Sequence, residues 1–272
     1  TESPDIVRGA INNNIIHVFY NNSTPLGTDT DRIGYISTDI HCYNDDSAKS
    51  VLTDYQDRIV VVGYTEACTD KIAVVRYLPN GDLDCHFGCH GKVRLHLGCG
   101  NYKGFSVAID SQNRILVAGV KESCVDKITI VRLLDDGSLD NDFACGDGYV
   151  VTHVRSDYCR KSLPNLMAID NCDGILIAGY KYNCENGSKD FVIEKYTSWG
   201  HRDECFGDCG RVLVDLSGNN DDYAYGLAVD SSENIVVFGK TYAPSDANDT
   251  YGDANIGVVK LDHHGNVDLS FG

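Results

Sequence analysis

The chain has 272 residues, with 40 acidic residues against 23 lysines and arginines, so its formal net charge is −17. This acidic balance argues against nucleic acid or an anionic membrane surface as a partner, because both bind basic faces. A hydrophobic fraction of 42% with 16 tyrosines argues against a disordered chain, and no apolar run reaches the roughly 18 residues that cross a bilayer. We therefore expect an ordered protein without membrane insertion.

Three repeated markers divide the chain into units. An aspartate recurs with spacings of 56, 60 and 60 residues, and a glycine follows each one nine residues later. A Gly-x-x-Asp motif then precedes a phenylalanine in every copy. These markers predict units at about residues 51–106, 107–166, 167–226 and 227–272. The three series are Asp54, Asp110, Asp170 and Asp230; Gly63, Gly119, Gly179 and Gly239; and Phe87, Phe143, Phe206 and Phe271.

Residues 5–50 are similar to a fifth, partial copy. At an offset of 57 residues, Ile15 falls on Ile72 and Ile36 falls on Val93. In the alternative register, residues 6–20 form an inner hairpin. We expect about five units, of which the first lacks its first strand and the last its fourth. Either the chain belongs to a longer propeller, or neighbouring subunits complete its open edges.

Each unit is expected to form four short strands. In the second complete unit these are residues 107–110, 115–119, 127–134 and 149–154, rich in Val and Ile and bounded by Gly, Asn and Asp. No segment shows sustained helical periodicity. A four-stranded unit of this size cannot bury both its faces alone, but units arranged radially bury one another. The pattern therefore predicts an all-β chain that forms a single β-propeller domain of four-stranded antiparallel blades.

Several segments carry a resemblance to a known family. The segments GDLDCHFG at residues 81–88, GSLDNDFA at 137–144 and GNVDLSFG at 265–272, with strands such as ILVAG at 115–119, resemble the tandem delta-60 repeat. This resemblance implies a propeller-type repeat of secreted and surface proteins, and the family brings no shared catalytic motif. The many cysteines of this chain depart from the usual pattern of the repeat.

The 12 cysteines point to an oxidising, extracellular compartment, because cytosolic proteins rarely carry so many thiols without metal-binding C-x2-C pairs. The repeat register places six cysteines on each face of the predicted propeller. On one face a recurring separation of 25 or 26 residues predicts the disulfides Cys42–Cys68, Cys99–Cys124 and Cys159–Cys184. On the other face we expect Cys85–Cys89, Cys205–Cys209 and Cys145–Cys172. Four N-x-[ST] sequons predict N-linked glycans at Asn21, Asn22, Asn186 and Asn248.

Three segments could hold a metal ion. The sequence CHFGCH at 85–90 offers Cys85, Cys89, His86 and His90, but the equivalent CFGDC turn lacks both histidines, so a disulfide turn explains these cysteines without a metal. Acidic loops could bind calcium, at Asp221 with Asp222 and in the segment that holds Asp246, Asn248, Asp249 and Asp253. Solvated turn carboxylates are the simpler interpretation of these loops, so no cofactor is predicted beyond the possibility of calcium.

No catalytic motif stands out. The chain has no G-x-S-x-G segment, and its repeated aspartates are better explained as turn residues that accept backbone N–H bonds. We therefore expect a non-enzymatic, secreted structural module, a subunit of an extracellular filament, coat or appendage, whose partners are copies of itself or other extracellular proteins. The alternative is a propeller that recognises a glycan or protein ligand. A glycosidase-like enzyme, acting through a pair of carboxylates, is the third possibility.

Overall fold

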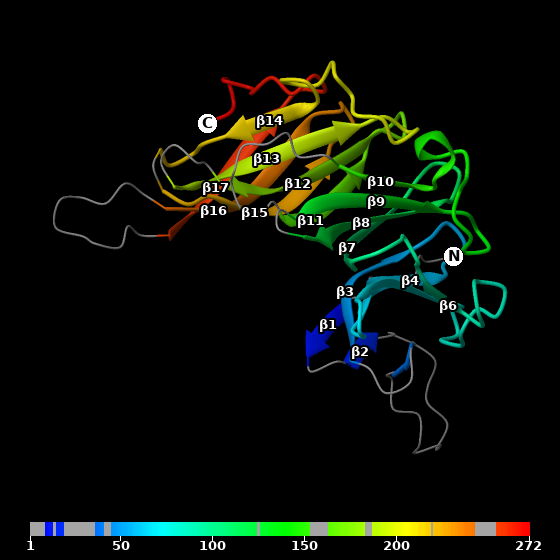
Figure 1. Cartoon of the computed structure of the whole chain (residues 1–272). Helices are drawn as coiled ribbons and strands as arrows, with labels where there is room; N and C mark the ends of the chain where they lie inside the picture. The colour runs from blue at the N-terminus through cyan, green and yellow to red at the C-terminus, as the bar shows by residue number, and fades with distance from the viewer. Residues whose placement is uncertain are drawn as a thin grey trace, which may run out of the picture.

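The computed structural model describes residues 9–12, 15–18, 36–40, 45–123, 126–152, 163–182, 187–218, 220–242 and 254–272. These residues form antiparallel sheets and one short 3₁₀ turn, Ala144–Gly146. Four sheets follow one another along an open arc, with the N-terminal and C-terminal blades at its two ends (Figure 1). Among the described residues, no helix is both long and apolar enough to cross a membrane.

Each blade is built from strands that are consecutive in the chain. The first blade contains β3 (Asp46–Thr53), β4 (Ile59–Thr65), β5 (Lys71–Tyr77) and β6 (Lys92–Arg94). The second contains β7 (Asn101–Ile109), β8 (Ile115–Glu122), β9 (Lys127–Leu133) and β10 (Tyr149–Val151). The third contains β11 (Leu163–Ile169), β12 (Ile175–Tyr182), β13 (Lys189–Tyr196) and β14 (Arg211–Val214). The fourth contains β15 (Tyr223–Val229), β16 (Ile235–Tyr242) and β17 (Ala254–Leu261).

The predicted β-propeller of antiparallel blades is confirmed, but the expectation of about five repeat units is wrong. The structure contains four blades, and the N-terminal segment forms a separate sheet of two strands, β1 (Gly9–Asn12) and β2 (Ile15–Val18). These two strands pair only with each other among the described residues, so they form a hairpin, as in the alternative register. An isolated pair of strands has too little apolar surface to make a blade of its own.

The repeated glycine marker is required by a bulge in the first strand of each blade. The register of β3 against β4 shifts between Ala48 and Ser50, which brings the carbonyl of Ser47 against Gly63. A Cβ at Gly63 would overlap that carbonyl oxygen. The same bulge recurs in the other blades, so the periodic glycine reflects close backbone approach rather than ligand binding.

The repeated aspartate marker shapes the turn after the first strand. Asp110 Oδ1 accepts the backbone N–H groups of Gln112 at 3.0 Å and of Arg114 at 2.9 Å. Asp54, Asp170 and Asp230 accept the corresponding pairs of N–H groups in their own blades. The prediction that these aspartates are turn residues is confirmed. Such carboxylates satisfy turn amides that the sheet leaves unpaired.

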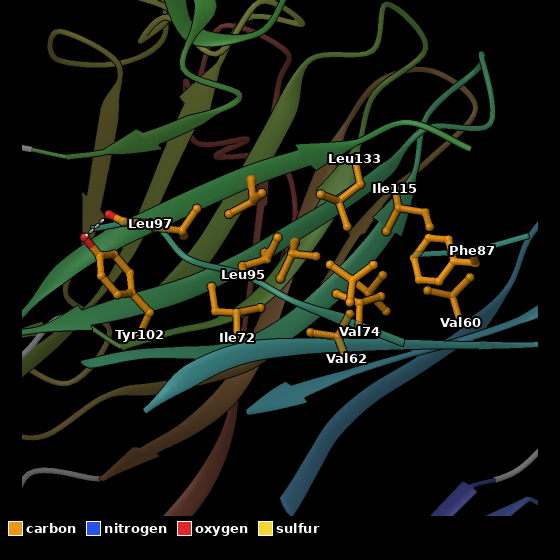
Figure 2. Close-up of a cluster of buried hydrophobic side chains, with 14 residues drawn as sticks. Val60, Val62, Ile72, Val74, Phe87, Leu95, Leu97, Tyr102, Ile115 and Leu133 are labelled. Atoms are coloured by element: carbon orange, nitrogen blue, oxygen red, sulfur yellow. Dashed lines mark hydrogen bonds between the residues drawn. The ribbon is translucent and has the colours of Figure 1, made fainter. Parts of the chain in front are cut away.

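Apolar layers between neighbouring blades form the core. At the first junction, Val60, Val62, Ile72 and Val74 pack with side chains of the second blade such as Ile115 and Leu133, as Figure 2 shows. Two further layers join the second blade to the third and the third to the fourth. The alternating side chains of each strand therefore face both neighbours, which explains the near-continuous apolar sequence of the middle strands.

A phenylalanine marks every junction. Phe87, Phe143 and Phe206 are at most 1% exposed, and each ring lies against the Gly-x-x-Asp glycine of the following blade, Gly137, Gly200 and Gly265 respectively. A backbone hydrogen bond accompanies the contact, as between the Gly88 N–H and the Asp136 carbonyl at 2.7 Å. Burying one such ring stabilises a junction by about 2–3 kcal/mol.

Candidate metal centre

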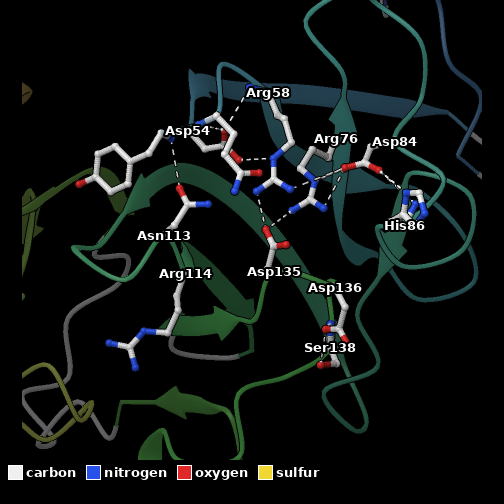
Figure 3. A network of polar contacts seen from close by, with 12 residues as sticks. Asp54, Arg58, Arg76, Asp84, His86, Asn113, Arg114, Asp135, Asp136 and Ser138 are labelled. Atoms are coloured by element: carbon white, nitrogen blue, oxygen red, sulfur yellow. Dashed lines mark hydrogen bonds and ion pairs between the residues drawn. The ribbon is translucent and has the colours of Figure 1, made fainter.

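A polar cluster at the first junction has a structural role. The Arg58 Nε lies 2.7 Å from Asp54 Oδ2, the Arg76 Nε lies 2.9 Å from Asp84 Oδ2, and both guanidinium groups reach Asp135 of the second blade (Figure 3). The hydrogen bond from Arg58 lowers the pKa of Asp135 below its usual range. This cluster links two blades through a carboxylate and two guanidinium groups.

The repeat provides the same pairing elsewhere. In the second blade, Arg114 lies 2.6 Å from Asp110 and Arg132 lies 2.7 Å from Asp140. In the third blade, a lysine takes over this role, and Lys195 lies 2.9 Å from Asp170. Groups that recur in three blades are explained by the architecture, so we do not assign a ligand to them.

A second polar cluster, formed by Asp190, Asp215 and Asp222, is not explained in this way. Asp190 is the second residue of β13, Asp215 follows β14, and Asp222 directly precedes β15. One carboxylate oxygen from each residue lies within 4.8 Å of the other two. Asp190 and Asp222 are only 6% and 0% exposed, whereas Asp215 is exposed. The third junction therefore brings together three acidic side chains, two of which are buried.

Neighbouring donors orient these carboxylates. The Leu216 N–H donates to Asp222 Oδ2 and the Ser217 hydroxyl donates to Asp222 Oδ1, both at 2.8 Å. The Ser217 N–H donates to Asp215 Oδ1 at 3.1 Å, and the Ser188 hydroxyl lies 3.1 Å from Asp190 Oδ1. Hydrogen bonds of this kind stabilise ionised carboxylates in a buried position.

The adjacent lysine is engaged by a different carboxylate. Lys189 Nζ lies 2.7 Å from Asp221 Oδ2 and also contacts the Tyr223 hydroxyl. Burial alone would lower the pKa of Lys189, but these bonds raise it above its ordinary value. Burial alone would raise the pKa of Asp221, whereas its bonds with Lys189 and Tyr223 lower it. Asp221 therefore belongs to this ion pair, and Asp222, one residue later, belongs to the acidic cluster.

The first junction has a positive charge where the third has this cluster. Lys71 and Asp190 occupy equivalent positions in their blades. The repeated glycine pairs with Ala73 in the first blade and with Val192 in the third, and Lys71 and Asp190 each lie two residues before that paired residue. The Lys71 ammonium lies 3.3 Å from the Gly100 carbonyl oxygen and 3.5 Å from that of Gly98. The first junction thus holds a cation supplied by its own chain at this place.

The second buried carboxylate also replaces a residue without negative charge. Tyr102 and Asp222 are also equivalent. Each lies two residues before the residue that pairs with a repeated glycine. Each also donates its backbone N–H across the junction, to the carbonyl oxygens of Asp70 and Lys189 respectively. The Lys71 ammonium lies 5.9 Å from the centre of the Tyr102 ring. The third junction therefore exchanges a lysine and a tyrosine for two buried aspartates, which the repeat itself does not require.

Carboxylate and hydroxyl oxygens are the donors that calcium and magnesium prefer, whereas zinc and copper favour nitrogen and sulfur. Of the calcium candidates in the sequence, only Asp222 lies in the cluster, and the segment from Asp246 to Asp253 lies outside the described residues. Sequence reasoning did not find Asp190 or Asp215. The available signal was the charge reversal at Asp190, where the other two complete units carry Lys71 and Lys127.

The described cysteines are free and exposed in the structure. The pairings Cys85–Cys89, Cys205–Cys209 and Cys145–Cys172 stay predictions. Several of these sulfurs lie beside an imidazole instead: Cys85 Sγ is 3.7 Å from His86 Nδ1, and Cys145 Sγ is 3.9 Å from His201 Nε2. The free described cysteines are Cys68, Cys85, Cys89, Cys99, Cys145, Cys172, Cys205 and Cys209.

The remaining predicted sites involve residues that the structure does not describe. Cys42, Cys124, Cys159 and Cys184 lie outside the described residues, so the pairings Cys42–Cys68, Cys99–Cys124 and Cys159–Cys184 stay predictions. The four predicted glycosylation sites also lie outside this part of the chain; they are Asn21, Asn22, Asn186 and Asn248.

Comparison with known protein families supports the fold. Residues 57–87 match the model of a family described as a domain of unknown function (DUF5122) β-propeller. This match supports a propeller-type repeat, but it does not extend to the delta-60 repeat or to an extracellular location. A search of curated proteins found no match. A solved gluconolactonase from Xanthomonas campestris is similar, with 11% identity, a TM-score of 0.33, and coverage of 82% of this chain and 84% of that chain.

The expected role as a non-enzymatic structural module of a filament, coat or appendage is corrected here. The finding set against it is the similarity to the gluconolactonase reported above, and we do not propose this role again. The gluconolactonase activity is stated for that protein, and at this similarity neither its substrate nor its reaction is transferred to this chain.

Proposed function

We propose that the chain is a calcium-binding propeller in which Asp190, Asp215 and Asp222 bind one Ca²⁺ between the third and fourth blades. The observation that carries this proposal is the exchange of Lys71 and Tyr102 at the first junction for Asp190 and Asp222 at the third. Three carboxylates whose oxygens lie within 4.8 Å of one another offer a calcium ion three of its oxygen ligands.

The bound ion would hold two blades together. Asp190 and Asp215 belong to the third blade and its following loop, whereas Asp222 leads into the fourth. Calcium takes six to eight oxygen ligands, so it accepts three carboxylates and still retains room for water. This proposal includes the extracellular location that the cysteine content predicts. Calcium sites in extracellular modules have dissociation constants of about 10⁻⁴–10⁻³ M.

Isothermal titration calorimetry and thermal unfolding, each in calcium and in EDTA, test the proposal. At ten times the dissociation constant, calcium should stabilise the protein by about 1.4 kcal/mol, which raises Tm by about 3–6 °C. Asp190→Asn should abolish the heat of binding and the Tm shift. Asp147→Asn, at an exposed position on the second blade, removes the same charge and should leave both unchanged.

A reversal variant makes the test sharper. Asp190→Lys restores the residue found at the equivalent position of the first blade. This variant should bind no calcium, and its Tm in EDTA should equal or exceed that of the wild type in EDTA, because the ammonium takes the place of the ion. The proposal is refuted if calcium leaves the wild-type Tm unchanged, or if it shifts the wild type and Asp190→Asn equally.

A further inference from the structure

The second junction lacks a carboxylate that the first junction has. At the first junction, Asp135 of the second blade accepts hydrogen bonds from both Arg58 and Arg76, and Figure 3 shows it between the two guanidinium groups. Asp135 lies two residues before the glycine of its Gly-x-x-Asp turn, and Ser198 holds this position in the turn of the third blade. The repeat therefore places an uncharged serine where the first junction has a bridging carboxylate.

Both arginines recur at the second junction, as Arg114 and Arg132. Each keeps an ion pair with an aspartate of its own blade, Arg114 with Asp110 and Arg132 with Asp140. These pairs recur with the repeat and need no ligand. The group that bridges the two guanidinium groups does not recur. The second junction therefore has two carboxylates beside its two arginines, where the first has three.

This difference leaves guanidinium N–H groups without an acceptor. Arg132 is 1% exposed, and among the described residues its buried Nη2 has no hydrogen-bond partner. Its Nη1 donates to the carbonyl oxygen of Ser198 in place of a charged acceptor. Arg114 Nη1 lies 3.6 Å from Asp140, and within the described part of the chain Arg114 Nη2 has no partner. Since unpaired donors in a buried position cost free energy, these groups point to a ligand that accepts hydrogen bonds.

The charge of the two arginines is also less well balanced than at the first junction. Burial and the neighbouring Arg114 lower the pKa of Arg132, while Asp140 acts in the opposite direction. At the first junction, burial also acts to lower the pKa of Arg58, but its hydrogen bond to Asp135 helps to raise it above its ordinary value. An anion at the equivalent place of the second junction would act on Arg132 in the same direction.

Other acidic side chains on the adjacent turns do not fill this place. Asp173, on a turn of the third blade, accepts hydrogen bonds from the N–H and the hydroxyl of Ser111, at 2.8 and 2.6 Å. Asp142 is exposed on the second blade. Among the described residues, neither carboxylate forms an ion pair with Arg114 or Arg132. The second junction therefore does not supply a substitute for the bridging carboxylate from these turns.

The place is open to solvent and lies on the turn that carries the chain's single tryptophan. The Asp135 side chain is 63% exposed at the first junction, so a ligand at the equivalent place can enter from solution. Trp199 directly follows Ser198, is 58% exposed, and stands where the second blade has Asp136. Its backbone carbonyl accepts the N–H of Ala144 at 3.0 Å, which holds this turn against the second blade. The exchange removes two negative charges and adds an aromatic ring at this turn.

We propose that Arg114 and Arg132 bind the carboxylate of a small organic acid, which takes at the second junction the place that Asp135 has at the first. Guanidinium groups match the planar geometry of a carboxylate, and this is the group that the repeat itself uses there. The exposed ring of Trp199 offers an apolar contact to the rest of the acid. The site shares no residue with the proposed calcium site, and it needs no metal.

Tryptophan fluorescence tests the proposal, because Trp199 is the only tryptophan of the chain. Acetate is titrated in EDTA at constant ionic strength, with excitation selective for tryptophan. It should change the emission with a dissociation constant on the order of 1 mM. Acetamide, a neutral analogue of similar shape, should not change it. Arg114→Gln should weaken acetate binding by about tenfold or more, and thermal unfolding checks that this variant folds.

A second variant restores the carboxylate of the first junction. Ser198→Asp should bind no acetate, and its Tm without acetate should exceed that of the wild type, because its own side chain takes the place of the ligand. Saturating acetate should raise the Tm of the wild type and leave that of Ser198→Asp unchanged. Ser231→Asp, at an exposed turn position of the fourth blade, adds the same charge and should respond to acetate like the wild type.

Three outcomes overturn the proposal. One is a wild type in which acetate changes neither the emission nor the Tm. Another is an equal response of the wild type and Ser198→Asp, which would place the acetate elsewhere. The third is an equal response to chloride or to acetamide, which would reveal a general effect of salt or solute and no carboxylate site.

Discussion

The ring of Phe87 lies against Gly137 across the first junction, and a Cβ at this glycine would come within 3.0 Å of the ring. The glycine also has a φ of +84°, in the left-handed region. A single backbone position therefore sets both the turn of the second blade and its distance from the first. The same relationship recurs between Phe143 and Gly200 and between Phe206 and Gly265.

Gly137→Ala should destabilise the protein by about 2–4 kcal/mol, which combines the left-handed backbone cost with overpacking against Phe87 and Val93. Urea unfolding measures the loss. Gly98→Ala is the matched control, because Gly98 has a φ of +94° but no atom lies within 4 Å of the place that the alanine methyl group would occupy. Gly98→Ala should reduce the free energy of unfolding only by the left-handed backbone cost, about 1 kcal/mol. Equal losses in the two variants would contradict the junction contact.

Replacing a buried turn aspartate should destabilise the protein more than replacing an exposed one. Asp110 is 1% exposed and bonds Arg114 as well as two turn N–H groups, whereas Asp230 forms the same turn at an exposed position. Asp110→Ala should cost about 3 kcal/mol, because it leaves two turn N–H groups unpaired and the partly buried Arg114 guanidinium with only its longer contact to Asp140, at 3.6 Å. Asp230→Ala should cost clearly less, because solvent replaces the lost hydrogen bonds at an exposed position. Chemical denaturation of both variants measures this difference, and similar losses would mean that burial does not decide it.

Acid should weaken the junction between the first two blades. The hydrogen bond from Arg58 lowers the pKa of Asp135 in the folded state. A carboxyl group with a lowered pKa contributes stability above its unfolded value of about 4, and this contribution is lost as the pH falls through the folded value. Asp135→Asn should therefore be less stable than the wild type at pH 7 and should lose less stability on acidification.

The expected size of this acid effect is modest. The Asp135 side chain is 63% exposed, so solvent screening limits its contribution to about 1 kcal/mol or less. Denaturant unfolding at a series of pH values between neutral and acid compares the two proteins. Asp142→Asn, at an exposed position in the second blade, serves as the control. If the pH dependence of Asp135→Asn follows that of the wild type, the ion pair contributes nothing to folding.

The pairing of Cys99 with Cys124 stays a prediction that peptide mapping can check. We expect a non-reduced digest to contain a peptide that joins these two residues, as the repeated separation of about 25 residues indicates. Reduction should release both fragments. A peptide that links Cys99 to any other cysteine would show that the repeat register does not determine the pairing on this face.

The sequence alone determined the period, the strand composition and the turns, because these depend on residues close together in the chain. Asp54 and its equivalents accept N–H groups two and four residues later, and the repeated glycines face a bulge in the adjacent strand. Local hydrogen bonding and side-chain alternation are visible in a repeated sequence. The β-propeller could therefore be predicted without a structure.

Only the tertiary structure decided the number of blades, the candidate metal centre and the contacts of the paired arginines. Asp190, Asp215 and Asp222 come from three different segments, and packing of the fourth blade on the third brings their oxygens within 4.8 Å. The arginines at the first two junctions follow the same local pattern, so the sequence predicts equivalent ion pairs there. Whether a carboxylate bridges them depends on the residue that the next blade brings against them, Asp135 or Ser198, which is a property of blade packing and not of any local pattern.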